Sequence, residues 1–457
     1  MLNFPQSHFY IVVNKKLARD FSGKERVRKL AGRKGLFTPR DVIEIKRILD
    51  FSDNKINLKI TPLGGQSGIG VANCWLFDYE NSQIIIDCGR RISEGSSSIF
   101  DPLDSAYPDF SLIDFTKLKA VVISHGHLDH CLGLPKLCEL LKENDTKIQL
   151  LATKTSLLVI ERVFNFAKIT DWREFFEVVE IEINNSYLYF PFSATPFPVH
   201  HSILDSVGLV IKMSGKKLVY LTDFKYIKSD WSQLKETSDQ FQEIGKNDID
   251  ALIVDSSNVA IDEFTSSITG AIDNFVKIFQ DPRYDNKRIF ITCFSSDIEI
   301  IGQIAHIANI VGGRPVEFEG STMRFFASNF IDLGDQSQYK GLPVVFITGC
   351  QAEPGSALVR STEDNNIRYQ VGPDDVVIFS SRMIPGNRRK IQDLIWELRN
   401  QGAEVITPDN GDYHLHVSGH GSARDYIQAV LDIFPKVVIP CHGNHYNRST
   451  LAGLIKS

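Results

Sequence analysis

Three histidines and one aspartate lie close together directly after a short apolar run. The run spans residues 120–123 (Ala-Val-Val-Ile), and residues 124–130 read Ser-His-Gly-His-Leu-Asp-His. A strand that ends here lets the chain turn, so that the side chains of His125, His127, Asp129 and His130 can converge on one point. Imidazole nitrogens and carboxylate oxygens are common ligands of divalent metal ions. The spacing therefore predicts a loop that holds two metal ions.

Three further donors follow apolar segments elsewhere in the chain. The pair His200-His201 follows Val199, Asp223 follows the segment 218–221, and His442 comes shortly after the segment 437–440. Adjacent side chains of an extended segment point to opposite sides, so only one histidine of the pair is expected to bind a metal. A carboxylate at Asp223 could bridge two cations. With these donors the chain offers two sites that leave coordination positions open for water.

The donor types indicate which metal and which chemistry to expect. Imidazole and carboxylate ligands without thiolate suit Zn²⁺, with Mn²⁺ as an alternative. Two such ions lower the pKa of a shared water toward ~7 and hold both oxygens of an in-line displacement at phosphorus. The pattern therefore favours phosphodiester hydrolysis.

The bulk composition is that of a globular protein with one large domain or several smaller ones. The chain has 457 residues, of which 43% are apolar and 23% charged, and its net charge is −6. Its apolar runs are too short to cross a membrane, and its start lacks the pattern of a signal peptide. The seven cysteines include no Cys-x-x-Cys pair, which favours reduced thiols over a zinc ribbon. We therefore expect a cytoplasmic protein.

Residues 1–55 form a basic N-terminal extension in this interpretation. Residues 9–13 could be a strand, and a helix is expected from Thr38 to about Leu49. Between them, residues 15–34 carry nine Lys or Arg side chains and two acidic ones. This stretch could contact RNA or an acidic partner, and a solvated amphipathic helix is the equally weighted alternative.

The rest of the chain reads as alternating strands and helices. Strands are expected at 58–63, 73–79, 83–87, 120–124 and 218–222. From about residue 263, amphipathic helices are expected at 269–279, 297–311, 387–401 and 422–434, separated by buried strands at 288–294, 343–349, 375–380 and 436–440. This pattern predicts an α/β fold.

Taken in order, the motifs resemble the β-CASP nucleic-acid-processing branch of the metallo-β-lactamase superfamily, and most of all the ribonuclease J family. The resemblance covers about residues 58–450. It rests on the motifs at 62–73, 86–89, 108–110, 125–130, 201–203, 222–225, 255–258, 348–354, 380–387, 416–421 and 440–443. Each motif is weak alone, but their shared order is a strong signal.

The resemblance implies a fold and a set of site residues. The fold is an αββα metallo-β-lactamase sandwich (56–262 and 409–457) interrupted by an α/β β-CASP domain (263–408). Two Zn²⁺ ions would be bound by His125, His127 and His201 on one side and by Asp129, His130 and His442 on the other, with Asp223 bridging. His420 would act as general acid, oriented by Asp255, and Asp129 would also take part in catalysis.

The same resemblance implies the substrate. Single-stranded RNA would lie between the domains and be cut as by an endonuclease, a 5′-to-3′ exonuclease, or both, by attack of a metal-bound hydroxide. The RNA would contact the loops of Ser418-Gly419 and of Ser380, Ser381 and Asn387, because backbone N–H groups of such turns bind anions. A homo-oligomer is also expected. The alternatives are a DNA nuclease, a hydrolase of small esters or lactones, and an RNA-binding subunit whose catalysis is dispensable.

One loop departs from the family pattern. Residues 294–300 resemble a loop that normally ends in His-Arg, but Glu299 and Ile300 stand at those positions here. The loss of cations should weaken attraction to the phosphate backbone. This departure bears on recognition of a 5′-monophosphate more than on hydrolysis.

Overall fold

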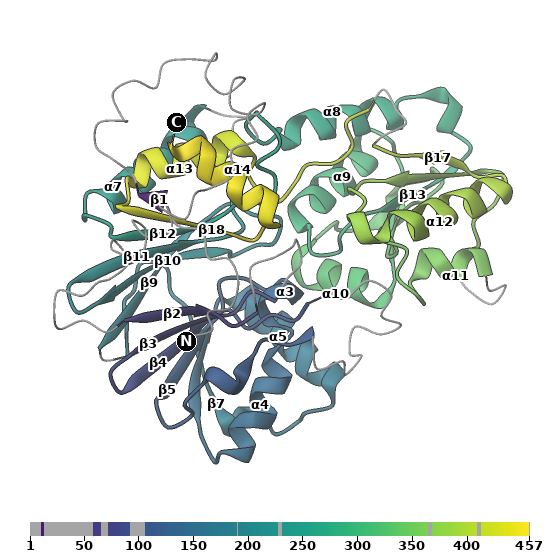
Figure 1. The fold of residues 1–457 in the computed structure, drawn as a ribbon. Helices are drawn as coiled ribbons and strands as arrows, with labels where there is room; N and C mark the ends of the chain where they lie inside the picture. Colours follow the sequence, from purple (N-terminus) through teal and green to yellow (C-terminus); the bar gives the residue numbers. More distant parts are fainter. Residues whose placement is uncertain are drawn as a thin grey trace.

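A computed structural model describes residues 11–12, 58–64, 72–91, 106–189, 191–226, 231–363, 368–408 and 413–456. The basic stretch 15–34 and the helix expected from Thr38 lie outside the described residues. Figure 1 shows two lobes: a pair of stacked sheets with helices on both outer faces, and a smaller lobe built on a third sheet.

The first sheet contains six strands in the order β2-β3-β4-β5-β6-β7. The first three pair antiparallel, and β4 to β7 run parallel. Helices α4 (Leu134–Glu143) and α5 (Lys154–Ala167) contribute buried apolar residues to the core on its outer face. The strands are β2 (Lys59–Pro62), β3 (Trp75–Tyr79), β4 (Ser82–Ile86), β5 (Leu118–Val122), β6 (Ile148–Ala152) and β7 (Phe176–Glu180).

The second sheet contains seven strands in the order β1-β18-β12-β11-β10-β9-β8. Its inner face packs against the first sheet, and α7 (Trp231–Gly245), α13 (Ala423–Ile433) and α14 (His445–Lys456) cover its outer face (Figure 1). The strands are β1 (Ile11–Val12), β8 (Tyr187–Tyr189), β9 (Phe192–Pro198), β10 (Val207–Met213), β11 (Lys216–Leu221), β12 (Ala251–Asp255) and β18 (Val437–Cys441). The expected αββα sandwich is therefore confirmed.

The smaller lobe is a parallel five-stranded sheet between two helical layers. Its order is β14-β15-β13-β16-β17, with strands Val316–Glu319, Val344–Ile347, Arg288–Thr292, Asp375–Phe379 and Glu404–Ile406. Helices α8 (Ile268–Phe279), α9 (Ile298–Ile310) and α10 (Ser321–Phe330) cover one face, and α11 (Ala357–Glu363) and α12 (Arg388–Asn400) cover the other. Crossover helices on both faces bury such a sheet completely, which explains its continuous apolar strands.

The two lobes pack against each other. Ile298 and Phe326 of the smaller lobe belong to the same buried cluster as the outer core of the first sheet. Arg162 on α5 lies over the ring of Phe325, and its Nη2 donates to Ser321 Oγ at 3.3 Å. These contacts fix one side of the space between the lobes.

No helix in the described part of the chain has the length and apolar character needed to cross a membrane.

Candidate metal centre

The ends of four strands and the loops after them deliver the donor side chains to one place. β5 leads into residues 124–130, β9 into His201, β11 into Asp223, and β18 into His442. Asp223 and His442 have left-handed backbones, with φ of 49° and 52°. Residues with a Cβ rarely adopt this conformation, and it persists at functional sites when the surrounding structure enforces it. The sharp turn after each strand directs both side chains into the site.

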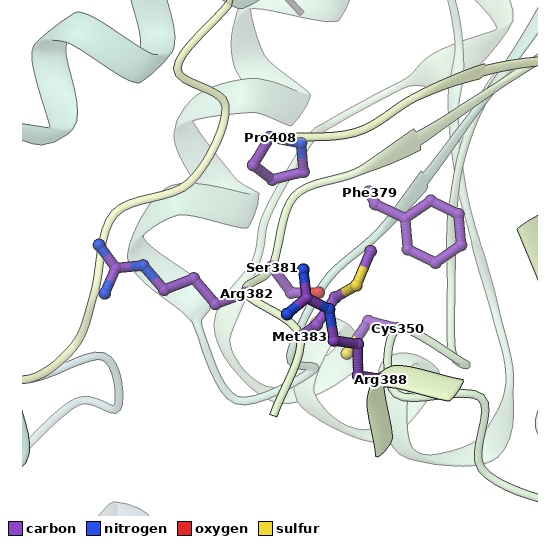
Figure 2. Close-up of a pocket in the computed structure, with 7 residues that line it drawn as sticks. All are labelled: Cys350, Phe379, Ser381, Arg382, Met383, Arg388 and Pro408. Atoms are coloured by element: carbon purple, nitrogen blue, oxygen red, sulfur yellow. The ribbon is translucent and has the colours of Figure 1, made fainter. Parts of the chain in front are cut away.

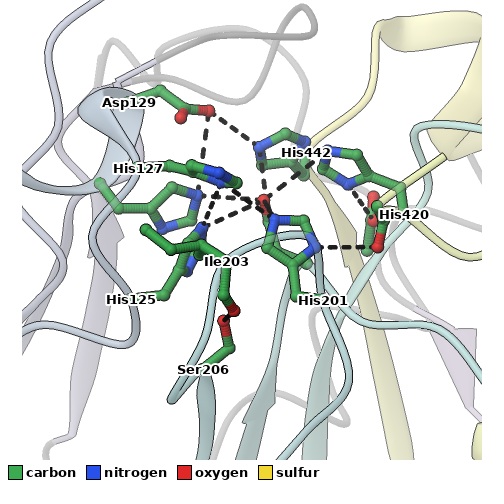
Figure 3. Close-up of polar contacts among 12 residues, drawn as sticks. His125, His127, Asp129, His201, Ile203, Ser206, His420 and His442 are labelled. Carbon is green, nitrogen blue, oxygen red and sulfur yellow. Dashed lines mark hydrogen bonds and ion pairs between the residues drawn. The ribbon is translucent and has the colours of Figure 1, made fainter. Parts of the chain in front are cut away.

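One group of donors gathers around His127. His127 Nδ1 lies 3.1 Å from His125 Nε2 and 3.0 Å from His201 Nε2 (Figure 3). Asp223 Oδ2 lies 3.6 Å from the Nε2 atoms of both His125 and His201. These four donor atoms lie within 4.8 Å of one another.

A second group gathers around Asp129. Its Oδ2 lies 3.2 Å from His442 Nε2 and 3.8 Å from His130 Nε2. Asp223 reaches this group as well, with Oδ2 3.4 Å from His130 Nε2 and Oδ1 3.4 Å from His442 Nε2. Asp223 therefore faces both groups, as a bridging ligand must.

The protonation of the rings is set by partners on the far side of each imidazole. His201 Nδ1 donates to the carbonyl of Gly419 at 2.8 Å, and His130 Nδ1 donates to Asp87 Oδ2 at 2.8 Å. Ser124 Oγ donates to Asp87 and so accepts from His125 Nδ1. A neutral imidazole carries one proton, so the Nε2 atom of each of these rings faces the site without a proton, and that of His130 lies 2.9 Å from Asn73 Nδ2.

The residues fit divalent cations. Burial lowers the pKa of His125 and His201 well below the usual value, and that of His127 to about 4, which favours the neutral form that binds metal. Asp223 Oδ1 is buried and makes no hydrogen bond within the described residues. Bare ring nitrogens that face one another around a buried carboxylate are costly to bury unless a cation lies between them.

The surroundings of His130 differ, because they favour positive charge on the ring itself. Burial lowers its pKa, but Asp223, Asp87 and Asp129 together raise it well above the usual value. A metal ion can replace the proton that these carboxylates attract. Asp87 is itself held by Tyr220 Oη at 2.7 Å and by the backbone N of Ser124 at 2.7 Å.

His420 lies at the edge of this cluster. Its Nδ1 donates to Asp255 Oδ2 at 2.9 Å, and its Nε2 lies 3.7 Å from Asp223 Oδ2. Burial lowers its pKa, but Asp223 and Asp255 raise it above the usual value overall. Asp223, His420 and His442 also form a close group of possible ligands. The geometry therefore allows His420 either to hold a proton or to bind a metal.

The residues predicted to bind substrate lie in different surroundings. Ser418 Oγ accepts from Asn258 Nδ2 at 2.9 Å, and Ser380 Oγ donates to the Leu415 carbonyl, so both hydroxyls have partners inside the protein. Gly419 lies so close to Ser202 that a Cβ would be 2.5 Å from its Oγ. Ser381 lines a separate cavity (Figure 2), and Asn387 lines the groove between the lobes.

That groove has a volume of about 720 Å³ and reaches Gly126 and His127 at the metal centre. Residues of both lobes line it, including Phe166 and Phe294. No carboxylate except Glu353 lines its described part, whereas it has six cationic side chains: Arg90, Arg91, Arg162, Arg324, Arg360 and Lys390. A positively charged groove that ends at the donor cluster suits an extended polyanion.

Two supporting residues were not assigned roles by the sequence analysis. Asp87 follows the apolar strand β4, and its position at a strand end could have indicated a role beside the ligands. Ser296 Oγ lies 3.0 Å from His127 Nε2, although it comes from the smaller lobe. Nothing in the sequence around Ser296 indicates this contact, because it depends on how the lobes pack.

Comparisons with known proteins agree with this architecture. Residues 83–283 match the model of the beta-lactamase superfamily domain, and residues 286–398 match that of the ribonuclease J beta-CASP domain. Ribonuclease J 1 of Streptococcus pyogenes is 30% identical over 86% of this chain and 70% of its own length. This chain belongs to the ribonuclease J family. It is therefore a metal-dependent hydrolase of the nuclease type, as the resemblance implied.

Other relatives extend this result. Ribonuclease J of Corynebacterium glutamicum is 28% identical over 84% of this chain, which spans 53% of that protein. A crystal structure of a protein of unknown function from Enterococcus faecalis V583 superposes with a TM-score of 0.60 at 12% identity, covering 86% of this chain and 96% of that one. At that identity the likeness shows the fold alone.

Proposed function

We propose that the protein hydrolyses phosphodiester bonds of single-stranded RNA with two divalent cations, Zn²⁺ or Mn²⁺. The observation that carries the proposal is the position of Asp223 between two donor groups, with its Oδ2 3.6 Å from His125 Nε2 and its Oδ1 3.4 Å from His442 Nε2. His125, His127 and His201 would hold one cation, and Asp129, His130 and His442 the other. When bound, the cations supply an activated water and neutralise charge on the phosphate.

His420 and Asp255 serve the leaving group in this proposal. Asp255 is fully buried and accepts from His420 Nδ1, which fixes the ring and leaves Nε2 facing the site. A proton on Nε2 can pass to the departing 3′ oxygen, and the buried carboxylate of Asp255 at Nδ1 favours the protonated ring.

The groove between the lobes is the proposed path of the RNA. Its cationic side chains attract phosphates, apart from Arg324, which is paired with Glu319. Asn387, which lines the groove, and the turn of Ser418-Gly419 would position the chain near the cut. Ile300 does not replace the arginine of the family pattern, because its side chain is buried in the core of the smaller lobe. We place the protein in the cytoplasm, since all seven cysteines are buried free thiols. A homo-oligomer remains a prediction.

The test uses RNA labelled at either end, with a 5′-monophosphate or a 5′-triphosphate, incubated with and without chelator. We expect the protein to cleave the RNA without chelator and not with it. The order in which labelled products appear gives the direction of degradation along the RNA. Asp129→Ala and His130→Ala should abolish cleavage, whereas His306→Ala, which removes an exposed histidine of the smaller lobe, should not. Full turnover by the Asp129 or His130 variant would refute the site. If DNA or a lactone is cleaved faster than RNA, that molecule replaces RNA as the proposed substrate.

A further inference from the structure

One buried side chain at the metal centre has no role in the proposed function. Asn73 is 4% exposed, and its carboxamide nitrogen Nδ2 lies 2.9 Å from His130 Nε2 and 3.4 Å from Asp129 Oδ2. Both of these atoms belong to the second donor group, and both face the centre of that group. The amide of Asn73 therefore lies among the metal donors and contacts two of them.

The backbone of Asn73 is fixed against the metal loop from both sides. Its N donates to the Asp129 carbonyl at 2.8 Å, and its carbonyl accepts from Gly89 N at 2.8 Å. Gly89 makes this close approach possible, since a Cβ there would lie 1.7 Å from the Asp129 carbonyl oxygen. The two family motifs that contain Asn73 and Gly89 thus place the amide beside the metal loop.

The amide lies close to the position that a cation of the second group requires. His130 Nε2 and Asp129 Oδ2 lie 3.8 Å apart. Zn²⁺ forms bonds of ~2.0–2.2 Å to such atoms, so a cation bound to both lies near the midpoint between them. In the triangle that these two atoms form with Asn73 Nδ2, the amide nitrogen lies about 2.5 Å from that midpoint. The end of the carboxamide is therefore close to bonding distance.

The oxygen of this amide can bind a cation, whereas its nitrogen cannot, because the nitrogen lone pair is delocalised into the carbonyl group. In the structure the nitrogen donates to His130 Nε2, which carries no proton. A half-turn about the Cβ–Cγ bond exchanges Nδ2 and Oδ1 without moving the rest of the side chain. Carbonyl and carboxylate oxygens suit Mn²⁺, whereas imidazole suits Zn²⁺.

We propose that Asn73 Oδ1 binds the cation of the second donor group and shifts the preference of that group toward Mn²⁺. With Asn73 the second group has three oxygen donors, the others coming from Asp129 and Asp223, beside two imidazoles. The first group has three imidazoles and Asp223. The two cation sites thus differ in donor type, an identification that rests on the proposed function, in which two cations occupy the centre.

The experiment measures binding of Zn²⁺ and of Mn²⁺ to chelator-stripped protein by competition with a chromophoric chelator, without RNA. Asn73→Leu keeps the approximate volume of the side chain and removes both of its polar atoms. In this variant the weakened site should lose at least about 10-fold in affinity for Mn²⁺ and clearly less for Zn²⁺. The other site should keep its affinity for both metals. A thermal melt in chelator shows whether each variant is folded.

A second variant, Asn73→Asp, separates a metal ligand from a hydrogen-bond donor. It keeps an oxygen at the same place and adds negative charge, so Mn²⁺ should bind at least as tightly as in the wild type. A residue that only donates to Asp129 and His130 predicts weaker binding, because a carboxylate cannot donate to either. Asn309→Leu is the matched control: it removes a buried amide that bonds the Arg314 carbonyl in the smaller lobe, and neither affinity should change.

Three outcomes would overturn the assignment of Asn73 as a ligand. These are equal losses for both metals in Asn73→Leu, no loss for either metal, and weaker binding of Mn²⁺ by Asn73→Asp. If Asn73→Leu does not fold, the result for Asn73→Asp decides. Because binding is read without RNA, a protein that binds both metals as expected but leaves RNA intact refutes the proposed function and not the role of Asn73.

Discussion

The two nitrogens of His420 have different surroundings. Nδ1 lies 2.9 Å from a buried carboxylate of Asp255, whereas Nε2 faces the metal centre from a side chain that is 23% exposed. The carboxylate can only accept from Nδ1, so the second nitrogen is the one that can exchange a proton with a substrate. The same carboxylate holds the ring in place, as expected of a group that orients a proton donor.

Replacement of His420 by alanine tests this role. Cleavage should slow by roughly 10²- to 10⁴-fold, because the leaving oxygen loses its proton donor, while the metal content of the protein stays at the wild-type level. Metal is measured by elemental analysis and cleavage by single-turnover kinetics. His414→Ala, an exposed histidine of the same segment, is the control. Loss of one metal equivalent on mutation would instead identify His420 as a ligand.

Asp297 predicts a pH dependence of stability. Burial raises its pKa to about 7, so the folded protein holds a proton that an unfolded aspartate releases near pH 4. Its contribution to stability is thus complete below about pH 4 and is lost as pH rises toward 7. Asp297→Asn should therefore stabilise the protein by about 1–4 kcal/mol at pH 7.5 and little at pH 4.5.

Melting curves in chelator at these two pH values check the effect of Asp297→Asn. Asp374→Asn, which removes an exposed carboxyl from the same lobe, should change neither melt. An equal shift of Asp297→Asn at both pH values would contradict a buried, protonated carboxyl.

Among the elements, the sequence predicts which segments form strands better than it predicts which strands pair with each other. The apolar runs before His125, Asp223 and His442 are strands, and helices expected at 269–279 and 422–434 appear as α8 and α13. β12, however, pairs with both β11 and β18, aligning Asp255 with Cys441, although 186 residues separate them. Parallel pairing of distant segments leaves no local signal, so the meeting of Asp255, Asp223 and His442 depends on tertiary packing.

Ser296 connects the smaller lobe to the metal centre and gives an element-scale prediction. Its Oγ lies 3.0 Å from His127 Nε2, on the far side of the ring from the site. Partners of this kind orient metal ligands, and their loss typically weakens metal affinity 10- to 100-fold. Ser296→Ala should therefore bind metal more weakly in competition with a chromophoric chelator, whereas Ser295→Ala should not. Equal metal affinity for both variants would show that the lobe contact does not orient His127.

For the whole molecule, the donors link the two sheets. Residues 125–130 follow β5 of the first sheet, whereas His201, Asp223 and His442 follow strands of the second. Cations held here would connect both halves of the sandwich. The sequence indicated these donors because each stands after an apolar strand. It also indicated a strand at residues 9–13, where the structure has β1, but not that β1 would join the second sheet, where Ile11 pairs with Val438 of β18.

Metal should therefore raise the thermal stability of the whole protein. A ligand that binds only the folded state at 100 times its dissociation constant adds about 2.7 kcal/mol. The melting temperature of chelator-treated protein should rise on addition of Zn²⁺ or Mn²⁺, and the rise should be much smaller in Asp223→Asn, which weakens both groups. A melting temperature that neither metal changes would argue against the donor set. An equal rise of the melting temperature in Asp223→Asn would show that the metal binds elsewhere.

The distance along the chain between the donors also affects when activity can begin. Asp129 and His442 face each other across 313 positions. A ribosome makes the chain from its N-terminus, so residues 125–130 emerge from the ribosome first. The strand β18, which pairs with β12 and leads into His442, is made much later. On the proposed function, a half-translated copy carries an incomplete ligand set and cannot cut the messenger that encodes it.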